Sequence, residues 1–149
     1  MASTTTSATS SDATIVQPST TEYDSPTYHF KLLYPSDFTV NEYDEDDGSH
    51  TTTFEGASPG DGFQISVRPY TSSYITPERF KTDDPSGVML QAQDIAIDGA
   101  PAKIFFGKNN QMGETREVWF IHGGFLYEVT TYKALDSWLG DIMITWKFI

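Results

Sequence analysis

Apolar and polar residues alternate with a period of two along most of the chain from residue 28 onward. In YHFKLLYP, Tyr28, Phe30 and Leu32 fall on one face before Pro35 ends the pattern. This alternation predicts strands with one buried face, because successive side chains of a strand point to opposite sides. The same pattern, rich in β-branched and aromatic residues, predicts further strands at 38–43, 50–56, 62–70, 115–122 and 125–132.

Glycine-containing dipeptides mark the turns between these strands. Gly123-Gly124 separates the last two predicted strands and suits a tight hairpin turn. Asp98-Gly99 predicts a turn within a strand pair at 95–108, although Pro101 argues for a wide or edge connection. The sequence therefore predicts antiparallel strands that follow one another along the chain.

Two segments depart from the strand period. In ITPERFKTDDPSG, Thr76 is placed as a helix N-cap and Pro77 as the first helical residue, which predicts a short middle helix. We expect residues 88–94 (VMLQAQD) to form a second helical turn or a linker. Near the C-terminus one apolar stripe recurs at helical spacing, formed by Leu135, Trp138, Leu139, Ile142, Met143 and Trp146. It predicts an amphipathic helix on the sheet, with room for a last strand at TWKFI.

This order of elements predicts an α+β domain. It comprises an antiparallel sheet of about six strands, flanked by a short middle helix and a C-terminal amphipathic helix. The expected domain covers residues 26–149. Residues 1–25 contain thirteen Ser or Thr and few large apolar groups, so we expect them to form a disordered tether.

Charge narrows the classes of partner. The formal net charge is −12, and residues 32–67 contain eight acids and no Lys or Arg. Such a field repels phosphate backbones and anionic lipid, so nucleic-acid binding is not expected. Basic proteins and cations remain as partners.

The chain has no cysteine, which excludes disulfides, thiol catalysis and thiolate zinc sites. It has no apolar run long enough to cross a membrane, so no membrane insertion is expected. A Ser/Thr-rich leader is typical of a stalk outside a removed signal peptide or lipid anchor, which favours an extracytoplasmic or cell-surface location. A cytoplasmic protein with a disordered tail is the alternative.

Several segments resemble the PsbP-like family: FKLLYPSDFTV, IAIDGAPAKIFF, and VWFIHGGFLYEVTTY followed by the terminal helix. The resemblance covers residues 28–149. That family shares its fold with the photosystem II extrinsic subunit and the yeast Ran-binding nuclear import factor, and it includes bacterial surface proteins. The resemblance implies a sheet between helices that serves as a platform for binding a partner, with no catalytic residues attached to the fold.

The acidic segment NEYDEDDGSH raises the question of a calcium site. With Gly48 at position 6 of an EF-hand loop, position 12 falls on Phe54, which has no oxygen, so that register fails. A looser calcium site from Asp44, Asp46 and Asp47 is a weaker hypothesis. The competing interpretation is a solvent-exposed hairpin turn in which Asp47-Gly48 supplies the positive φ angle.

The three histidines, His29, His50 and His122, lack the helical spacing of a metal motif and are expected at strand or edge positions. Beside several carboxylates, His50 should favour its charged form or join a metal site. Five aromatic residues could line a sugar or peptide groove but fit a core better: Trp119, Tyr127, Tyr132, Trp138 and Trp146.

No G-x-S-x-G or phosphate-binding loop is present, so we do not expect an enzyme. The sequence predicts a non-catalytic extracytoplasmic binding or accessory domain with a protein partner and no cofactor. The alternatives are a small-ligand or cell-wall glycan module with exposed aromatics, and a weak calcium-binding domain through residues 42–48.

Overall fold

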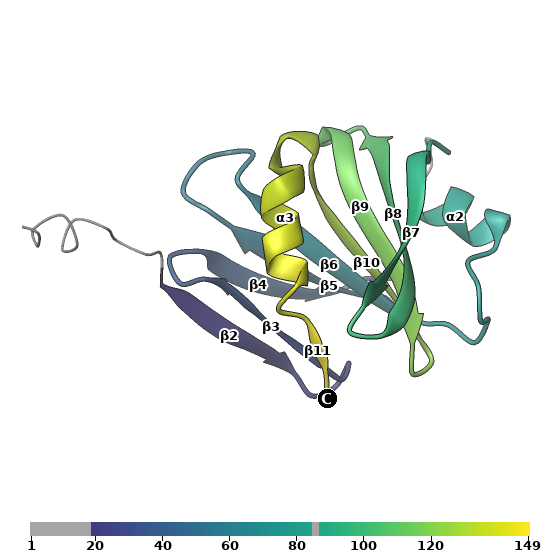
Figure 1. Cartoon of the computed structure of the whole chain (residues 1–149), viewed down its shortest axis with the longest axis horizontal. Helices are drawn as coiled ribbons and strands as arrows, with labels where there is room; N and C mark the ends of the chain where they lie inside the picture. Colours follow the sequence, from purple (N-terminus) through teal and green to yellow (C-terminus); the bar gives the residue numbers. More distant parts are fainter. Residues whose placement is uncertain (1–18, 85–86) are drawn as a thin grey trace, which may run out of the picture.

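The computed structural model describes residues 19–84 and 87–149, and within them ten strands form two antiparallel sheets (Figure 1). The larger sheet has seven strands in the order β4 (Thr39–Asp44), β5 (His50–Glu55), β6 (Gly62–Pro69), β10 (Phe125–Tyr132), β9 (Gly113–His122), β8 (Ala100–Asn109) and β7 (Leu90–Ile97). The smaller sheet has three strands in the order β11 (Lys147–Phe148), β3 (Phe30–Pro35) and β2 (Thr20–Ser25).

The main core lies between the two layers. The smaller sheet and α3 (Asp136–Met143) lie against one face of the larger sheet, which we call the inner face (Figure 1). Trp146, which follows α3, stacks on Phe30 of β3 with ring centroids 4.2 Å apart and meets Phe120 of β9 edge-on at 4.9 Å. This aromatic cluster joins both sheets and the C-terminal segment.

The opposite, outer face of the larger sheet carries α2 (Pro77–Asp83). Thr76 caps this helix by accepting a hydrogen bond from the Arg79 amide at 3.1 Å, as the sequence predicts. Phe80 of α2 packs against Phe105 and Trp119 of the sheet. A short 3₁₀ helix, η1 (Lys133–Leu135), leads from β10 into α3.

The α+β class, the middle helix, the C-terminal helix and the hairpins are confirmed. Gly123 and Gly124 have φ angles of 59° and 87°, the left-handed values that a tight hairpin turn requires. The expected number of strands is wrong, because residues 19–84 and 87–149 form ten strands rather than about six. Strand β2, which the sequence did not predict, lies at the margin of the smaller sheet, and β11 falls within TWKFI, where a last strand was expected to have room.

The prediction of a helical turn or linker at 88–94 is also wrong. Residues 90–97 form strand β7, an edge strand whose side chains are mostly exposed and whose pairing is interrupted by a bulge between Leu90 and Gln93. An exposed edge strand does not need the alternation that identifies a half-buried strand. The local sequence therefore carries little strand signal.

The boundary placed at residue 25 is corrected as well. Thr20–Ser25 forms β2, which pairs with β3, and Tyr23 packs on Phe30 and Phe54. The folded domain therefore begins before residue 26. Residues 1–18 lie outside the described part of the chain, and for them the tether stays a prediction.

Candidate functional site

The centre of the outer face is polar. Because strand side chains alternate, Phe63, Ile65 and Val67 of β6 enter the core, whereas Gln64, Ser66 and Arg68 point outward. Strand pairing places these outward residues beside polar, outward-facing residues of the neighbouring strands. One row across the sheet is Thr51, Ser66 and Glu128, and the next is Thr53, Gln64, Thr130 and Glu117.

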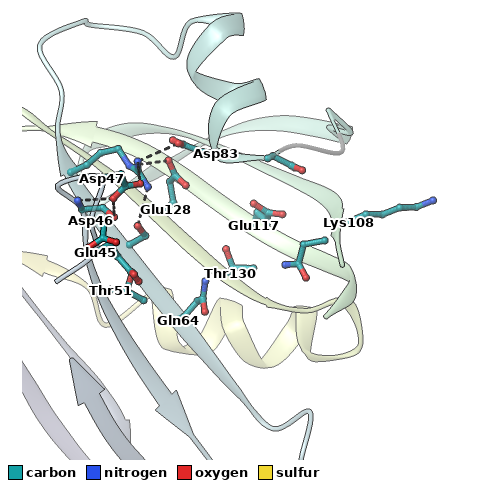
Figure 2. Close-up of a pocket in the computed structure, with 15 residues that line it drawn as sticks. Glu45, Asp46, Asp47, Thr51, Gln64, Asp83, Lys108, Glu117, Glu128 and Thr130 are labelled. Atoms are coloured by element: carbon teal, nitrogen blue, oxygen red, sulfur yellow. Dashed lines mark hydrogen bonds and ion pairs between the residues drawn. The ribbon is translucent and has the colours of Figure 1, made fainter. Parts of the chain in front are cut away.

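Apart from Thr53, the residues of these rows form the floor of a cleft of about 450 Å³, which we call the polar cleft (Figure 2). Its walls are the β4–β5 turn (45–49), Asp83 and Asp84 at the end of α2, and Lys108 and Asn109 at the end of β8. Every residue that lines it is polar or charged, with seven acids against two bases. The cleft is therefore strongly acidic.

Arg68 lies at one end of the polar cleft and contacts three acids. Its Nη1 atom is 3.2 Å from both Asp47 Oδ2 and Asp83 Oδ1, and its Nε atom is 3.8 Å from Glu128 Oε2. Arg79 of α2 adds a contact to the same Asp83 oxygen at 3.3 Å. The guanidinium thus ties the β4–β5 turn, α2 and β10 to β6.

Glu128 is a buried acid of the cleft whose pKa is raised. Its side chain is 9% exposed, and its Oε2 atom has no hydrogen-bond donor among the described residues. Burial raises the pKa of Glu128 well above its usual range. The hydrogen bond that protonated Glu128 makes to the Asp83 carboxyl and the negative charge of that carboxyl raise the pKa further. Arg68 offsets this shift in part. Glu128 therefore holds a proton to unusually high pH.

Glu117 is buried at the middle of the cleft but is fully hydrogen-bonded. Its Oε2 accepts from the Thr115 hydroxyl at 2.6 Å and its Oε1 from the Trp119 indole at 3.0 Å. Burial raises its pKa, and the charge of Asp84 acts in the same direction. A Cβ at Gly107 would lie 2.7 Å from Glu117 Oε2, so the glycine makes room for this carboxyl.

The three predicted calcium ligands make different contacts. Asp44 is bound to His50, and Asp47 accepts hydrogen bonds from the Ser49 hydroxyl and amide at 2.6 and 3.0 Å. These bonds, with the charge of Arg68, lower the pKa of Asp47 to about 2. Asp46 is exposed at the rim of the polar cleft.

In the described part of the chain, no group of three or more His, Cys, Asp or Glu is arranged to hold a metal ion. Calcium binding stays a prediction. The expected turn is present: the Glu45 amide donates to the Ser49 carbonyl at 2.8 Å, and Gly48 has a φ angle of 88°.

His50 bridges two acids of the hairpin. Its Nδ1 lies 2.8 Å from Asp44 and its Nε2 lies 2.8 Å from Glu42, while its ring stacks on Tyr28. Burial alone would lower the pKa of His50, but the two hydrogen bonds outweigh it and the pKa is raised. Its charged form is favoured, as expected. His122 lies in β9 and stacks on Phe148, and His29 precedes β3 with a φ angle of 63°.

Most of the five aromatic residues that could line a sugar or peptide groove belong to the core. Trp119, Tyr127 and Trp146 are at most 1% exposed, and Tyr132 and Trp138 are half-buried. A second hollow of about 710 Å³, which we call the apolar hollow, lies between the 73–80 segment and strands β8 and β9. Tyr74, 66% exposed, is at its edge, whereas Trp119 lies beneath Phe80.

Asp83, Glu117 and Glu128 are not among the candidate residues that the sequence patterns indicate. A signal was present for Glu117: in EVWFIH the alternation puts Glu117 on the same face as Trp119 and Ile121, which indicates a buried acid. No local signal identifies Asp83, because its role depends on where the end of α2 meets the sheet.

Comparisons with known proteins establish the fold. The structure is similar to the solution structure of cyanobacterial PsbP (CyanoP) from Synechocystis sp. PCC 6803, with a TM-score of 0.65 over 91% of this chain and 96% of that one. The sequences are 12% identical over this match, so the similarity concerns the fold alone. No protein-family model and no curated protein sequence matches the chain. The chain has a PsbP-like fold, as the sequence resemblance implied.

The described part of the chain has no helix that is long and apolar enough to cross a membrane.

Proposed function

We propose that this chain is a non-catalytic, extracytoplasmic binding or accessory domain that engages a protein partner, and that the partner presents a basic segment to the polar cleft. The observation that supports this most directly is the cleft itself, in which seven acids face two bases. A concave acidic surface attracts basic segments and repels acidic ones.

The other parts of the proposal rest on the sequence. The chain has no recognisable nucleophile motif, which supports a binding role. The Ser/Thr-rich residues 1–25 support a location outside the cytoplasm, since such leaders serve as stalks. The PsbP-like fold is compatible with a domain that works by contact with another protein.

Much of the acidic surface is accessible to a partner. Glu45 and Asp46 are exposed at the rim, and the Asp47 side chain is 58% exposed although it also pairs with Arg68. Contacts between exposed charges weaken as salt screens them over about 10 Å at 0.1 M. Binding of a basic partner should therefore be strong at low salt and weaker at physiological salt.

A defined peptide tests this proposal. The full chain, labelled with ¹⁵N, is titrated with hexalysine and, separately, with hexaglutamate, at about 20 and about 200 mM sodium chloride. We expect hexalysine to shift amide signals of residues 45–51, 64–68 and 128–130 and to bind more weakly at high salt, while hexaglutamate causes no shift. Equal responses to both peptides, or hexalysine shifts confined to other surfaces, would overturn the proposal.

The apolar hollow favours a second candidate, a small-ligand or glycan module. Its volume of about 710 Å³ lies in the range of ligand pockets, and its lining includes Tyr74, Phe80 and Met89. Trp119 offers little surface there because it is only 1% exposed. Titration with chitohexaose should then shift signals of residues 73–80, and Tyr74→Ala should weaken that response. A lack of response at millimolar sugar would exclude this class of glycan.

A further inference from the structure

Two buried carboxyl oxygens at one end of the polar cleft have no hydrogen-bond donor among the described residues. They are Glu128 Oε2 and Asp83 Oδ2. Their side chains are 9% and 4% exposed, so both are more than nine-tenths buried. Both residues line the cleft, and Figure 2 shows them at the same end of it. When both carboxyls are ionised, each of these buried acceptors lacks a donor, which is unfavourable, so a ligand that supplies donors is favoured at that point.

The neighbouring cations do not satisfy these atoms. Arg68 donates to Asp47 and approaches the other oxygen of Asp83, Oδ1, at 3.2 Å, and its Nη2 donates to Ser66. Its Nε is 3.8 Å from Glu128 Oε2, which is too long for a hydrogen bond. Arg79 also contacts Asp83 through Oδ1. The guanidinium groups of Arg68 and Arg79 therefore donate no hydrogen bond to Glu128 Oε2 or Asp83 Oδ2.

We propose that this end of the polar cleft binds a primary ammonium group, that of a lysine side chain on the basic partner, with Glu128 Oε2 and Asp83 Oδ2 as its acceptors. The inference rests on the proposed function and specifies the anchoring group. The two acceptors belong to side chains on different elements, β10 and α2, which suits a compact ammonium with three rotatable donors. A guanidinium prefers both oxygens of one carboxylate, and Asp83 Oδ1 is already taken.

Binding should depend on pH. Without a bound cation, the raised pKa of Glu128 means that the carboxyl pair retains a proton. An ammonium group has to displace that proton, so its affinity should rise with pH. The charged groups that face Glu128 are Asp83 from α2, Arg68 from β6 and Glu117 from β9, and Asp47 from the β4–β5 turn contacts the same Arg68.

The test uses small probes on the full ¹⁵N-labelled chain. Nα-acetyl-lysine methylamide carries the ammonium, the norleucine analogue has an apolar side chain without the charge, and the arginine analogue carries a guanidinium. The lysine probe should shift the Glu128 and Asp83 amide signals, more tightly at about pH 8 than at about pH 6. The norleucine probe should cause no shift, and the arginine probe should bind more weakly than lysine.

Glu128→Gln keeps the side-chain shape and removes the charge. It should weaken binding of the lysine probe by about tenfold or more, as expected for a hydrogen bond to a charged group. Glu45→Gln is the matched comparison because it neutralises an exposed acid of the same cleft, and it should weaken binding less than Glu128→Gln does, since exposed charges contribute less than buried ones. Asp83→Asn is a second test at the other acceptor, and thermal melts verify that each variant is folded.

The outcomes separate this inference from the proposed function. If Glu128→Gln and Glu45→Gln weaken the lysine probe equally, or if arginine binds more tightly than lysine, the ammonium site is overturned. Hexalysine binding to the wild-type chain would then still support the proposed function. If hexalysine does not bind but the lysine probe binds through Glu128, the proposed function is overturned and the ammonium site is supported.

Discussion

Glu128→Gln should make the folded protein more stable than the wild type at pH 8, although it removes a contact with Arg68. The raised pKa of Glu128 means that the folded state holds its proton to higher pH than the unfolded state, in which the group titrates near its ordinary value of 4.5. Stability is therefore highest below that ordinary value and falls as pH rises toward the folded pKa. Glutamine does not ionise, so the variant does not lose stability in this way as the pH rises.

One proton changes the free energy of unfolding by at most about 1.4 kcal/mol per pH unit. For a chain of this size, 1 kcal/mol corresponds to roughly 2–4 °C in melting temperature, so the effect is about 3–6 °C per pH unit. Glu117 and His50 also have raised pKa values and contribute with the same sign. Both proteins contain Glu117 and His50, so subtracting the wild-type melting temperature from that of the variant at each pH removes the contribution of these two residues. Arg68 retains Asp47 and Asp83, each at 3.2 Å.

The assay is thermal unfolding followed by circular dichroism between about pH 5 and about pH 8. The melting temperature of Glu128→Gln minus that of the wild type should be small at the low end and grow as pH rises. Glu45→Gln, at an exposed position, should show a flat difference. A difference for Glu128→Gln that is negative at pH 8, or that does not change with pH, would refute the reasoning from burial.

Three further predictions concern the core, the hairpin and the N-terminal strand. Trp146→Ala should cost about 3–5 kcal/mol, because the ring is 1% exposed and stacks on Phe30; a cost below 1 kcal/mol in urea unfolding would contradict its central place. The raised pKa of His50 means that its stabilisation, about 1 kcal/mol or less, is present at low pH and lost as pH rises through that pKa. His50→Gln should therefore lower stability at pH 5 but not at high pH, and an equal loss at both would argue against the charged bridge. Removing residues 1–25 deletes β2 and should lower the melting temperature by several degrees relative to removing 1–18, whereas equal values would show that β2 contributes nothing.

Predictions from the sequence succeed where neighbouring residues suffice. The alternation in β6, the Thr76 cap and the Gly123-Gly124 turn each depend on a few adjacent residues, and each is present in the structure. Local preferences decide these features because turn geometry and side-chain direction are set within a few residues. The acidic hairpin was also correctly predicted as a pair of strands with a turn at Gly48.

Strand β2 and the first half of β7 could not be predicted in the same way. Thr20–Ser25 has the composition of a flexible segment, and β7 is almost entirely exposed, so neither has a periodic apolar face along its length. Each becomes a strand because an adjacent strand, β3 or β8, presents unpaired backbone groups to it. That condition exists only after the rest of the sheet has formed.

In the polar cleft, too, some features follow from the local sequence and others from long-range packing. The sequence by itself determined that the chain is acidic, that its strands alternate, and that Asp47 and Gly48 form a turn. Only the tertiary structure decided that Glu128 stands beside Asp83, because β10 pairs with β6 far away in sequence and α2 ends above that pair. Burial of a charge depends on what covers it, and for Glu128 that cover comes from distant segments. The pKa shift and the unsatisfied oxygens follow from that long-range packing.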